Sequence, residues 1–532
     1  MSFASSCVRV GRATVRAGAV GVVAATLAFV YVVPFGALLF TALAPGREGL
    51  RFPTGLVFRS ALTSLIVCFA IAVCAAVLGA GAALGSRWVS NRTRICLDAL
   101  ILLPVLFPPF IHAALIRAAI GPAGAWVRTS PSNALLRGLP LFIVASLFAY
   151  VPLAYFFARL ALGSVDERVV DAARMLGVRG FRLARLAYGR QLFLGCLPAM
   201  LLTLVFTISD PLTPSVVGAD VSHVGMLLWL QISGFGSQRT AALLALVLGF
   251  ACLLVLLVAA GLVRHLEPEF ARWLRRLRWS LNAVPSRPVG TPKGVRAVPT
   301  IGVALVGLVE IGLILALAQR GGGHRVSEII TTVLLALVAL LVAALVAWIG
   351  LLAQQRFRTV VDVLFASLLM VPGATIGTSL AFAYGPRSPL AFPTSRVGAT
   401  LVILAAFASL SIPVVYALVR LTVATIDPRV ITTARVLGAS KWRAIAACVL
   451  PRIRFFTVGG TAIVVALSTV MVAPLIWVTS PQVPVLIPRL YAMVDHSAYA
   501  QAGTSLATVL LAVGTVVILT WAVTRIGAAK KQ

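Results

Sequence analysis

Acidic residues are scarce in this 532-residue chain: Asp and Glu together number 14, against 45 Lys and Arg. Charged residues of both signs make up only 11% of the chain and apolar residues 60%. A soluble domain carries about 25% charged residues. This composition excludes an ordinary soluble fold and indicates that lipid is the solvent for much of the chain.

Several chemical motifs are missing as well. The seven cysteines form no CxxC pair and the five histidines have no metal-ligand spacing, so we expect no metal site and no disulfide framework. No GxxxxGK(S/T) phosphate loop occurs, so the chain cannot bind ATP by that route. We expect no catalytic residues and no cofactor. The basic residues recur between apolar blocks instead of forming one patch, which argues against nucleic acid as a partner.

The chain does have a series of long apolar blocks separated by short polar stretches. A spanning helix needs roughly 20 apolar residues, and in lipid the backbone must satisfy its own hydrogen bonds, so each block is predicted to be a helix. The block 192–217, with Pro198, Pro211 and Pro214, and the block 455–478, with Pro474, are expected to be kinked or broken. We predict an all-α polytopic membrane protein with about twelve spans, at 18–43, 60–85, 95–119, 139–162, 192–217, 240–263, 299–319, 327–353, 360–384, 398–419, 455–478 and 502–524.

The basic residues also predict the orientation of these spans. Loops on the cytoplasmic side of a membrane carry an excess of Lys and Arg. With both termini inside, the most basic loops, at 159–190, 264–297 and 420–454, all fall on the inner side. The first apolar block is too long for a signal-peptide core, so we expect it to remain as a span. We therefore predict a multi-pass protein of the plasma (bacterial inner) membrane with cytoplasmic N- and C-termini.

Two segments of the chain repeat each other. Residues 166–182 read DERVVDAARMLGVRGFR, and residues 427–443 read DPRVITTARVLGASKWR. A weaker echo upstream aligns Asp98 with Asp362, near the start of the third span of each half. Both long segments fall between a fourth and a fifth span on the cytoplasmic side. Two copies with the same orientation indicate a parallel internal repeat.

The repeat predicts three parts of the chain. A first half of about six spans covers residues 1–264, and a second half of about six spans covers 298–532. The stretch between them, 265–297, is basic, amphipathic at first and then rich in Pro and Gly. We expect it to be a cytoplasmic linker whose charge faces the lipid bilayer.

The repeated segments resemble the EAA loop of ABC importer permeases, whose pattern is Glu-Ala-Ala, three residues, Gly and a later Leu-Pro. The two loops lie at 163–190 and 420–454. Neither loop has the glutamate, and the first has Arg190 where the second has its proline. The matching residues are Asp171, Ala172, Ala173, Gly177, Thr433, Ala434, Gly438, Leu450 and Pro451.

This resemblance implies a type I permease fold and a role. Each loop would form a short helix that docks on a separate ABC ATPase subunit, present in two copies, while an extracytoplasmic solute-binding protein delivers the substrate. The small alanines would allow close approach, and the glycines suit a helix end. The chain itself would be a transport permease and no enzyme, working by alternating access.

The substrate class is suggested by the fused arrangement and by FTISDPLTPSVVG at 206–218. Both resemble the iron(III), thiamine and 2-aminoethylphosphonate permeases. The resemblance leaves iron(III), thiamine, an aminophosphonate or a polyamine as candidate solutes.

Charged residues inside the membrane are few and are the default pointers to a pathway. They are Asp98, Asp210, Asp362, Arg117 and Glu310. The predicted pathway residues are Thr207, Ser209, Asp210, Thr213 and, in the second half, Ser468. The alternative for Asp210 is a helix cap beside Pro211. His112 is expected to be a buried structural histidine.

Two rival functions remain open at this point. A secondary, ion-coupled transporter with two six-helix repeats would show inverted repeats and charged midplane sites, which this sequence lacks. A non-transporting membrane scaffold would show no nucleotide-driven uptake.

Overall fold

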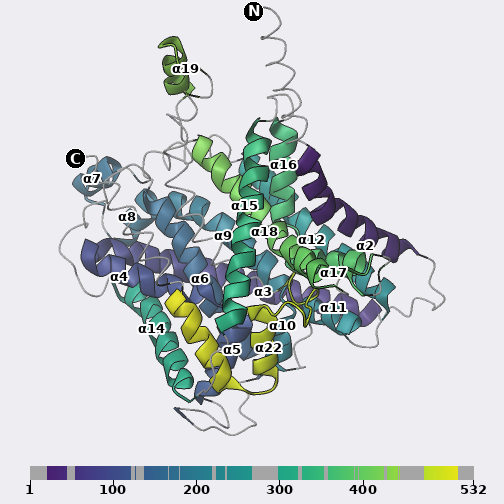
Figure 1. Ribbon diagram of the computed structural model, residues 1–532. Coiled ribbons are helices and arrows are strands. Elements are labelled where there is room, and N and C mark those ends of the chain that lie inside the picture. Colours follow the sequence, from purple (N-terminus) through teal and green to yellow (C-terminus); the bar gives the residue numbers. More distant parts are fainter. Residues whose placement is uncertain are drawn as a thin grey trace, which may run out of the picture.

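The structure of the chain is a computed structural model. It describes residues 21–44, 54–120, 126–127, 137–163, 165, 167–178, 180–218, 223–233, 237–265, 297–320, 326–352, 358–386, 388, 390–392, 395–424, 428–440, 443, 473–512 and 514. The regular elements in these residues are all helices (Figure 1). The predicted all-α polytopic fold is confirmed.

Eight helices in the described part of the chain are long and apolar enough to cross a membrane. The first runs from Gly21 through a π-helical turn, η1 (Ala28–Val32), into α2 (Val33–Leu43). The others are α3 (Thr54–Gly85), α6 (Gly138–Gly163), α9 (Arg190–Ile208), α12 (Gln238–His265), α14 (Val298–Ala318), α15 (Val326–Leu352) and α18 (Arg396–Ala424).

The third span of each predicted half is not one straight helix. In the first half α4 (Asn91–Leu102) and η3 (Leu103–Leu106) meet α5 (Pro109–Ile120) at a bend of 100°. In the second half α16 (Arg358–Leu369) meets α17 (Gly373–Tyr384) at 93°.

The predicted straight spans 95–119 and 360–384 are therefore corrected to bent pairs. Each break contains a proline, Pro108 or Pro372, which lacks an amide hydrogen and disfavours helical geometry in the residue before it.

The fifth span of the first half is broken, as its prolines predict. α9 ends at Ile208, and the short helix α10 (Leu212–Val217) follows after Pro211. Of the last two predicted spans, 455–478 lies mostly outside the described residues. Only the first part of 502–524 is described, within a helix over 499–512. A total of about twelve spans stays a prediction, because the described helices account for eight spans, or ten when each bent pair counts as one.

The same packing partners recur in the two predicted halves. α3 packs along α6, and α15 packs along α18 in the corresponding way. The first helix of each half packs on the other half: α2 lies against α17, and α14 lies against α3 and α4.

Hydrogen bonds fasten these crossed contacts. Tyr31 Oη donates to the Ser409 carbonyl at 2.5 Å, and Tyr384 Oη donates to the Phe29 carbonyl at 2.7 Å. On the other side Thr300 Oγ1 donates to a carbonyl of α3 at 2.6 Å. The two sets of helices therefore interlock.

Two short helices mark one end of the bundle. α7 (Glu167–Met175) and α19 (Pro428–Val436) lie toward the top of Figure 1, and we name this the loop end. α10 and α22 (Leu486–Asp495) lie toward the bottom, which we name the far end. α11 (Val224–Ser233) and α22 were not predicted; each lies between a fifth and a sixth span.

Candidate functional site

The helix α7 ends on a glycine in the left-handed conformation. Gly177 has φ +79°, which L side chains rarely adopt. The Gly177 amide donates to the Arg174 carbonyl at 2.9 Å, and the Val178 amide donates to the Ala173 carbonyl at 3.0 Å. These two bonds form a Schellman cap, which satisfies carbonyls that the helix end leaves free.

The helix α19 ends in the same way. Gly438 has φ +88°. Its amide donates to the Arg435 carbonyl at 3.1 Å, and the Ala439 amide donates to the Ala434 carbonyl at 3.0 Å. The expectation that Gly177 and Gly438 stand at helix ends is confirmed, and both caps have one hydrogen-bond pattern.

Each cap displays two large apolar side chains. Met175 and Leu176 are 89% and 83% exposed at the end of α7. Val436 and Leu437 are both 81% exposed at the end of α19. The sequence analysis did not single out these four residues, although each pair directly precedes a matched glycine. Exposed apolar pairs in fixed positions are suited to a protein partner.

The other predicted loop residues in α7 contribute less to an apolar surface. Asp171 and Ala172 are exposed and Ala173 is half-buried. The Arg174 guanidinium lies 3.2 Å from Asp171 Oδ1, in an exposed i,i+3 pair. In α19, Thr433 is exposed and Ala434 is half-buried. Leu450 and Pro451 lie outside the described residues.

The first loop is anchored to the spans beside it. Val170 is fully buried with Tyr155 and Tyr188 in a core cluster at the loop end. Arg87, in the short 3₁₀ turn (Ser86–Trp88) directly after α3, donates to the Leu162 carbonyl at 3.3 Å, and its guanidinium lies 4.8 Å from the centre of the Tyr188 ring. The segment after α7 is thereby held to α3 and α6.

The predicted pathway residues of the first half are all buried at the break between α9 and α10. Thr207 Oγ1 donates to the Thr203 carbonyl at 2.6 Å, and Ser209 Oγ to the Val205 carbonyl at 2.5 Å. Asp210 Oδ1 accepts the amide hydrogens of the first turn of α10, including that of Thr213 at 3.1 Å. Asp210 also accepts from the Thr213 hydroxyl.

The capping alternative for Asp210 therefore describes its contacts in this conformation. That these four residues line a passage stays a prediction, and Ser468 lies outside the described residues.

An aromatic cluster joins the two predicted halves at the far end. The Trp229 ring of α11 lies 4.9 Å from the Trp477 ring and 6.2 Å from the Tyr491 ring of α22, between centroids. The hydroxyls of Ser215 and Tyr491 are 3.3 Å apart.

Trp477 packs directly on Gly377 of α17, where any β-carbon would also come within 2.8 Å of Pro474 Cα. The sequence analysis did not single out this cluster, because its members are far apart in the chain.

Both aligned aspartates are engaged by residues of the fourth span. Tyr155 and Arg159 of α6 face Asp98, and Tyr416 and Arg420 of α18 face Asp362. Each of these two aspartates is therefore engaged by both a tyrosine and an arginine. Tyr155 aligns with Tyr416, and Arg159 with Arg420, in the same register as the repeated loops. The sequence therefore held a signal for both pairings.

Two further titratable side chains meet across the predicted halves. His112 Nδ1 of α5 lies 2.5 Å from Glu310 Oε1 of α14, and both side chains are almost fully buried. His112 Nε2 lies 3.1 Å from the Phe107 carbonyl, so that nitrogen carries a proton and donates it. The expectation of a buried structural histidine fits this arrangement. Arg117 donates to the Val216 carbonyl at 2.6 Å.

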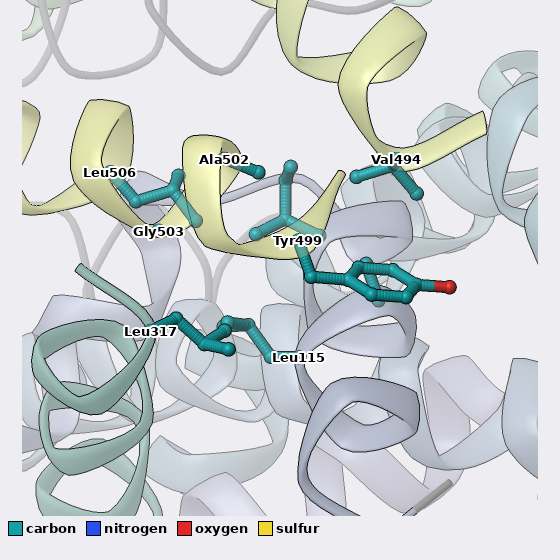
Figure 2. Close-up of a pocket in the computed structure, with 9 residues that line it drawn as sticks. Leu115, Leu317, Val494, Tyr499, Ala502, Gly503 and Leu506 are labelled. Carbon is teal, nitrogen blue, oxygen red and sulfur yellow. The ribbon is translucent and has the colours of Figure 1, made fainter. Parts of the chain in front are cut away.

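A small pocket lies between α5, α14 and the helix at 499–512 (Figure 2). Leu115, Leu317 and Leu506 face one another in it, and the Tyr499 hydroxyl points away from them. The lining contains no charged side chain, so the pocket offers packing and no recognition of a polar solute. In the part of the chain that the structure describes, no group of three or more His, Cys, Asp or Glu could hold a metal ion.

Comparison with known proteins identifies the class. Residues 75–272 match the family "Binding-protein-dependent transport system inner membrane component". A probable molybdenum ABC transporter permease of Haloferax volcanii is 26% identical over 240 residues, which cover 44% of this chain and 87% of the relative. A probable ABC transporter permease, y4fN, of Sinorhizobium fredii is 24% identical over 395 residues, 68% of each chain.

These matches also bear on the size of the chain. Nearly the whole of the Haloferax relative is covered by less than half of this chain, whereas the Sinorhizobium alignment is longer than either predicted half. Together with the apolar helices, the matches show a multi-pass membrane protein that is similar to ABC transporter permeases, with a match to the binding-protein-dependent inner-membrane component over residues 75–272.

Proposed function

We propose that this chain supplies both permease halves of a binding-protein-dependent importer, fused in one chain with one coupling helix in each. The observation that carries the proposal is the pair α7 and α19. They stand at the same end of the bundle, end in the same cap and expose an apolar pair at the same place. One chain thus offers two equivalent docking points.

The partner that fits these points is an ATPase dimer. Two equivalent points on one chain suit two copies of one subunit, related by the axis that relates the halves. The exposed pairs Met175–Leu176 and Val436–Leu437 would enter a groove on each subunit, and the nearby arginines would meet acidic groups at its rim. The loop end is then cytoplasmic, in agreement with its basic sequence.

The route for the solute lies between the halves. In the described conformation the aromatic cluster of Trp229, Trp477 and Tyr491 joins the two halves at the far end. Closure of the ATPase dimer would draw α7 and α19 together and part this cluster, so that a loaded binding protein could release its solute from outside. The transport step is a population shift between two packings of the same helices.

The solute is small and is supplied by a separate binding protein. Iron(III), thiamine, an aminophosphonate and a polyamine are the candidates from the sequence, and the name of the Haloferax relative adds a molybdenum compound. An uptake panel with these five probes, in cells that carry the matching binding proteins, would separate them.

The test of the proposal is co-purification from the native membrane. The tagged wild-type chain should bring with it a P-loop ATPase at about two copies per chain. Replacing Gly177 and Gly438 by Val should abolish that association, because a β-branched residue at positive φ costs about 1–2 kcal/mol or more and unwinds the cap.

A matched control uses Asn at the same two positions. Asn tolerates the left-handed conformation, so the Asn variant should keep most of the ATPase. Recovery of the Val variant with a full complement of ATPase would overturn the role of the caps. A wild-type chain that purifies without any ATPase would overturn the proposed function itself.

A further inference from the structure

The two aspartates aligned by the repeat lie close to the loop end. Asp98 belongs to α4 and Asp362 to α16, the first limbs of the two bent pairs. Arg159 and Arg420 stand in the last turns of α6 and α18, the spans that lead into the coupling helices. Gly163 ends α6 and Glu167 begins α7, so the connection is only a few residues long.

The contacts make a three-residue set in each half, which we name the first and second triads. In the first triad the Tyr155 hydroxyl donates to Asp98, and Arg159 Nε lies 3.9 Å from the same carboxylate. In the second triad, Tyr416 donates to Asp362 at 2.5 Å and Arg420 donates through Nε at 2.7 Å and through Nη2.

The sets are half-buried rather than free at the surface. The side chains of Asp98 and Asp362 are 29% and 31% exposed, and those of Arg159 and Arg420 are 24% and 22% exposed. Charges in partly dry surroundings are screened little, so each triad holds its two helices with more force than an exposed pair would. The two carboxylates that meet the fourth spans are among the charged groups that the predicted pathway does not include.

The first triad also touches the anchor of the coupling loop. Tyr155 belongs to the same buried cluster as Val170 of α7 and Tyr188 of the segment that follows. Displacement of α7 must therefore move the ring that holds Asp98. Because the interior is packed, such a shift is passed on and not absorbed.

We propose that the two triads are the mechanical links through which the coupling helices move the bent pairs. Each triad ties the last turns of the fourth span to the first limb of the bent pair. The second limb of the pair, α5 or α17, carries a far-end contact: Phe110 with Tyr491, or Gly377 with Trp477. A displacement at the loop end thereby reaches the aromatic cluster. This inference rests on the proposed function, and the six triad residues are positioning residues.

The experiment uses the full chain with its co-purified ATPase in proteoliposomes. All native cysteines are replaced, and Ala114→Cys with Ala502→Cys reports the far end, because both residues line the small pocket between α5 and the helix at 499–512 and neither belongs to the proposed link. A short bifunctional thiol reagent measures closure with and without MgATP. ATP hydrolysis is followed in the same sample. No transported solute is needed.

The triads are broken by Asp98→Asn with Asp362→Asn. ATPase binding and hydrolysis should stay within about twofold of the parent, while the ATP-dependent change in cross-linking should fall at least about fivefold. A charge swap in the second triad, Asp362→Arg with Arg420→Asp, is made with the first triad intact. It should restore most of the ATP-dependent change in cross-linking that Asp362→Asn alone removes. A merely structural role would not separate hydrolysis from movement.

The matched control is another cross-element ion pair, Arg489–Glu328, with atoms 3.7 Å apart near the far end. Glu328→Gln should leave the ATP-dependent change as in the parent. If the double Asn variant loses its ATPase through misfolding, Tyr155→Phe with Tyr416→Phe removes two hydrogen bonds and keeps both aspartates.

The Phe variant should lose at least half of the change, and a full change in a folded Asn or Phe variant would overturn the proposal. A parent that binds no ATPase, or whose cross-linking ignores ATP, would instead contradict the proposed function.

Discussion

The first and second triads use the same residue types in the same register but with unequal geometry. Asp362 receives a forked pair of hydrogen bonds from Arg420 as well as one from Tyr416. Asp98 receives the Tyr155 hydroxyl, while Arg159 stays 3.9 Å away. Forked Arg–carboxylate pairs are the stronger arrangement. The two triads therefore share their residue types but differ in the number of close hydrogen bonds to the aspartate. The first triad is the more loosely bonded one in this conformation.

The largest expected effect comes from the position of His112, where the two predicted halves have different residue types. In the register that aligns Asp98 with Asp362, His112 aligns with Ile376, so the second half has an apolar side chain where the first has a buried polar pair with Glu310. His112→Ala should cost about 3–5 kcal/mol of stability, because it leaves a buried carboxyl group without its partner. Thermal unfolding of the detergent-solubilised chain, followed by size-exclusion chromatography, measures the loss.

The control makes the first half resemble the second. His112→Ile with Glu310→Leu removes both polar groups and should recover most of the lost stability, since an apolar replacement of a buried pair is often neutral. A double variant as unstable as His112→Ala would show that the packing around the pair, and not its charge, is what matters.

The next largest expected effect concerns Gly377, on which the Trp477 ring packs. Gly377 aligns with Ala113 in the same register, and both are at the second limb of a bent pair. Gly377→Ala should destabilise the chain by about 1–3 kcal/mol, because the new methyl group would overlap the Trp477 ring and approach the backbone of Ala473 and Pro474.

The reverse change in the first half is the comparison. Ala113→Gly should cost only about 1 kcal/mol, the usual loss for glycine inside a helix. Thermal unfolding of both variants, followed by size-exclusion chromatography, measures the two losses of stability side by side. Equal losses would mean that Trp477 moves aside at little cost.

The sequence predicted the membrane class, the eight spans that the structure describes as single helices and the positions of both caps. Apolar blocks of the required length and a repeated loop are local signals, and they need no knowledge of tertiary contacts. The sequence analysis did not predict the bends at Pro108 and Pro372. A proline indicates a break in a helix, but the packing of the surrounding helices determines the bend angle.

The partners of the candidate residues were harder to predict. Tyr155 and Tyr416 follow the repeat register, so the triads could have been found from aligned positions alone. The contact of His112 with Glu310 and the cluster around Trp477 join residues far apart in the chain. Such contacts depend on how the two halves interlock, which periodicity within one helix does not encode.

The smaller difference between two single tyrosine variants would sharpen the comparison of the two triads. Tyr155→Phe should cost about 1.5–3 kcal/mol, because the Tyr155 hydroxyl is the close donor to Asp98. Tyr416→Phe should cost less, about 0.5–1.5 kcal/mol, because Arg420 still holds Asp362 with two hydrogen bonds. Unfolding midpoints of the two single variants test the order. A greater loss in the Tyr416 variant would reverse the assignment of the looser half.

The smallest effect is expected at the exposed pair on α7, which has no acidic counterpart in α19. Asp171 aligns with Thr432, and the Asp171 side chain is 66% exposed beside Arg174. Asp171→Thr should change stability by less than about 0.5 kcal/mol, because solvent screens such a pair. ATPase retention on the tagged chain should be unchanged as well, since the exposed apolar pair and the glycine cap remain. A clear loss of ATPase with an unchanged unfolding midpoint would show that Asp171 contacts the partner directly, and that the two loops bind it through different chemistry.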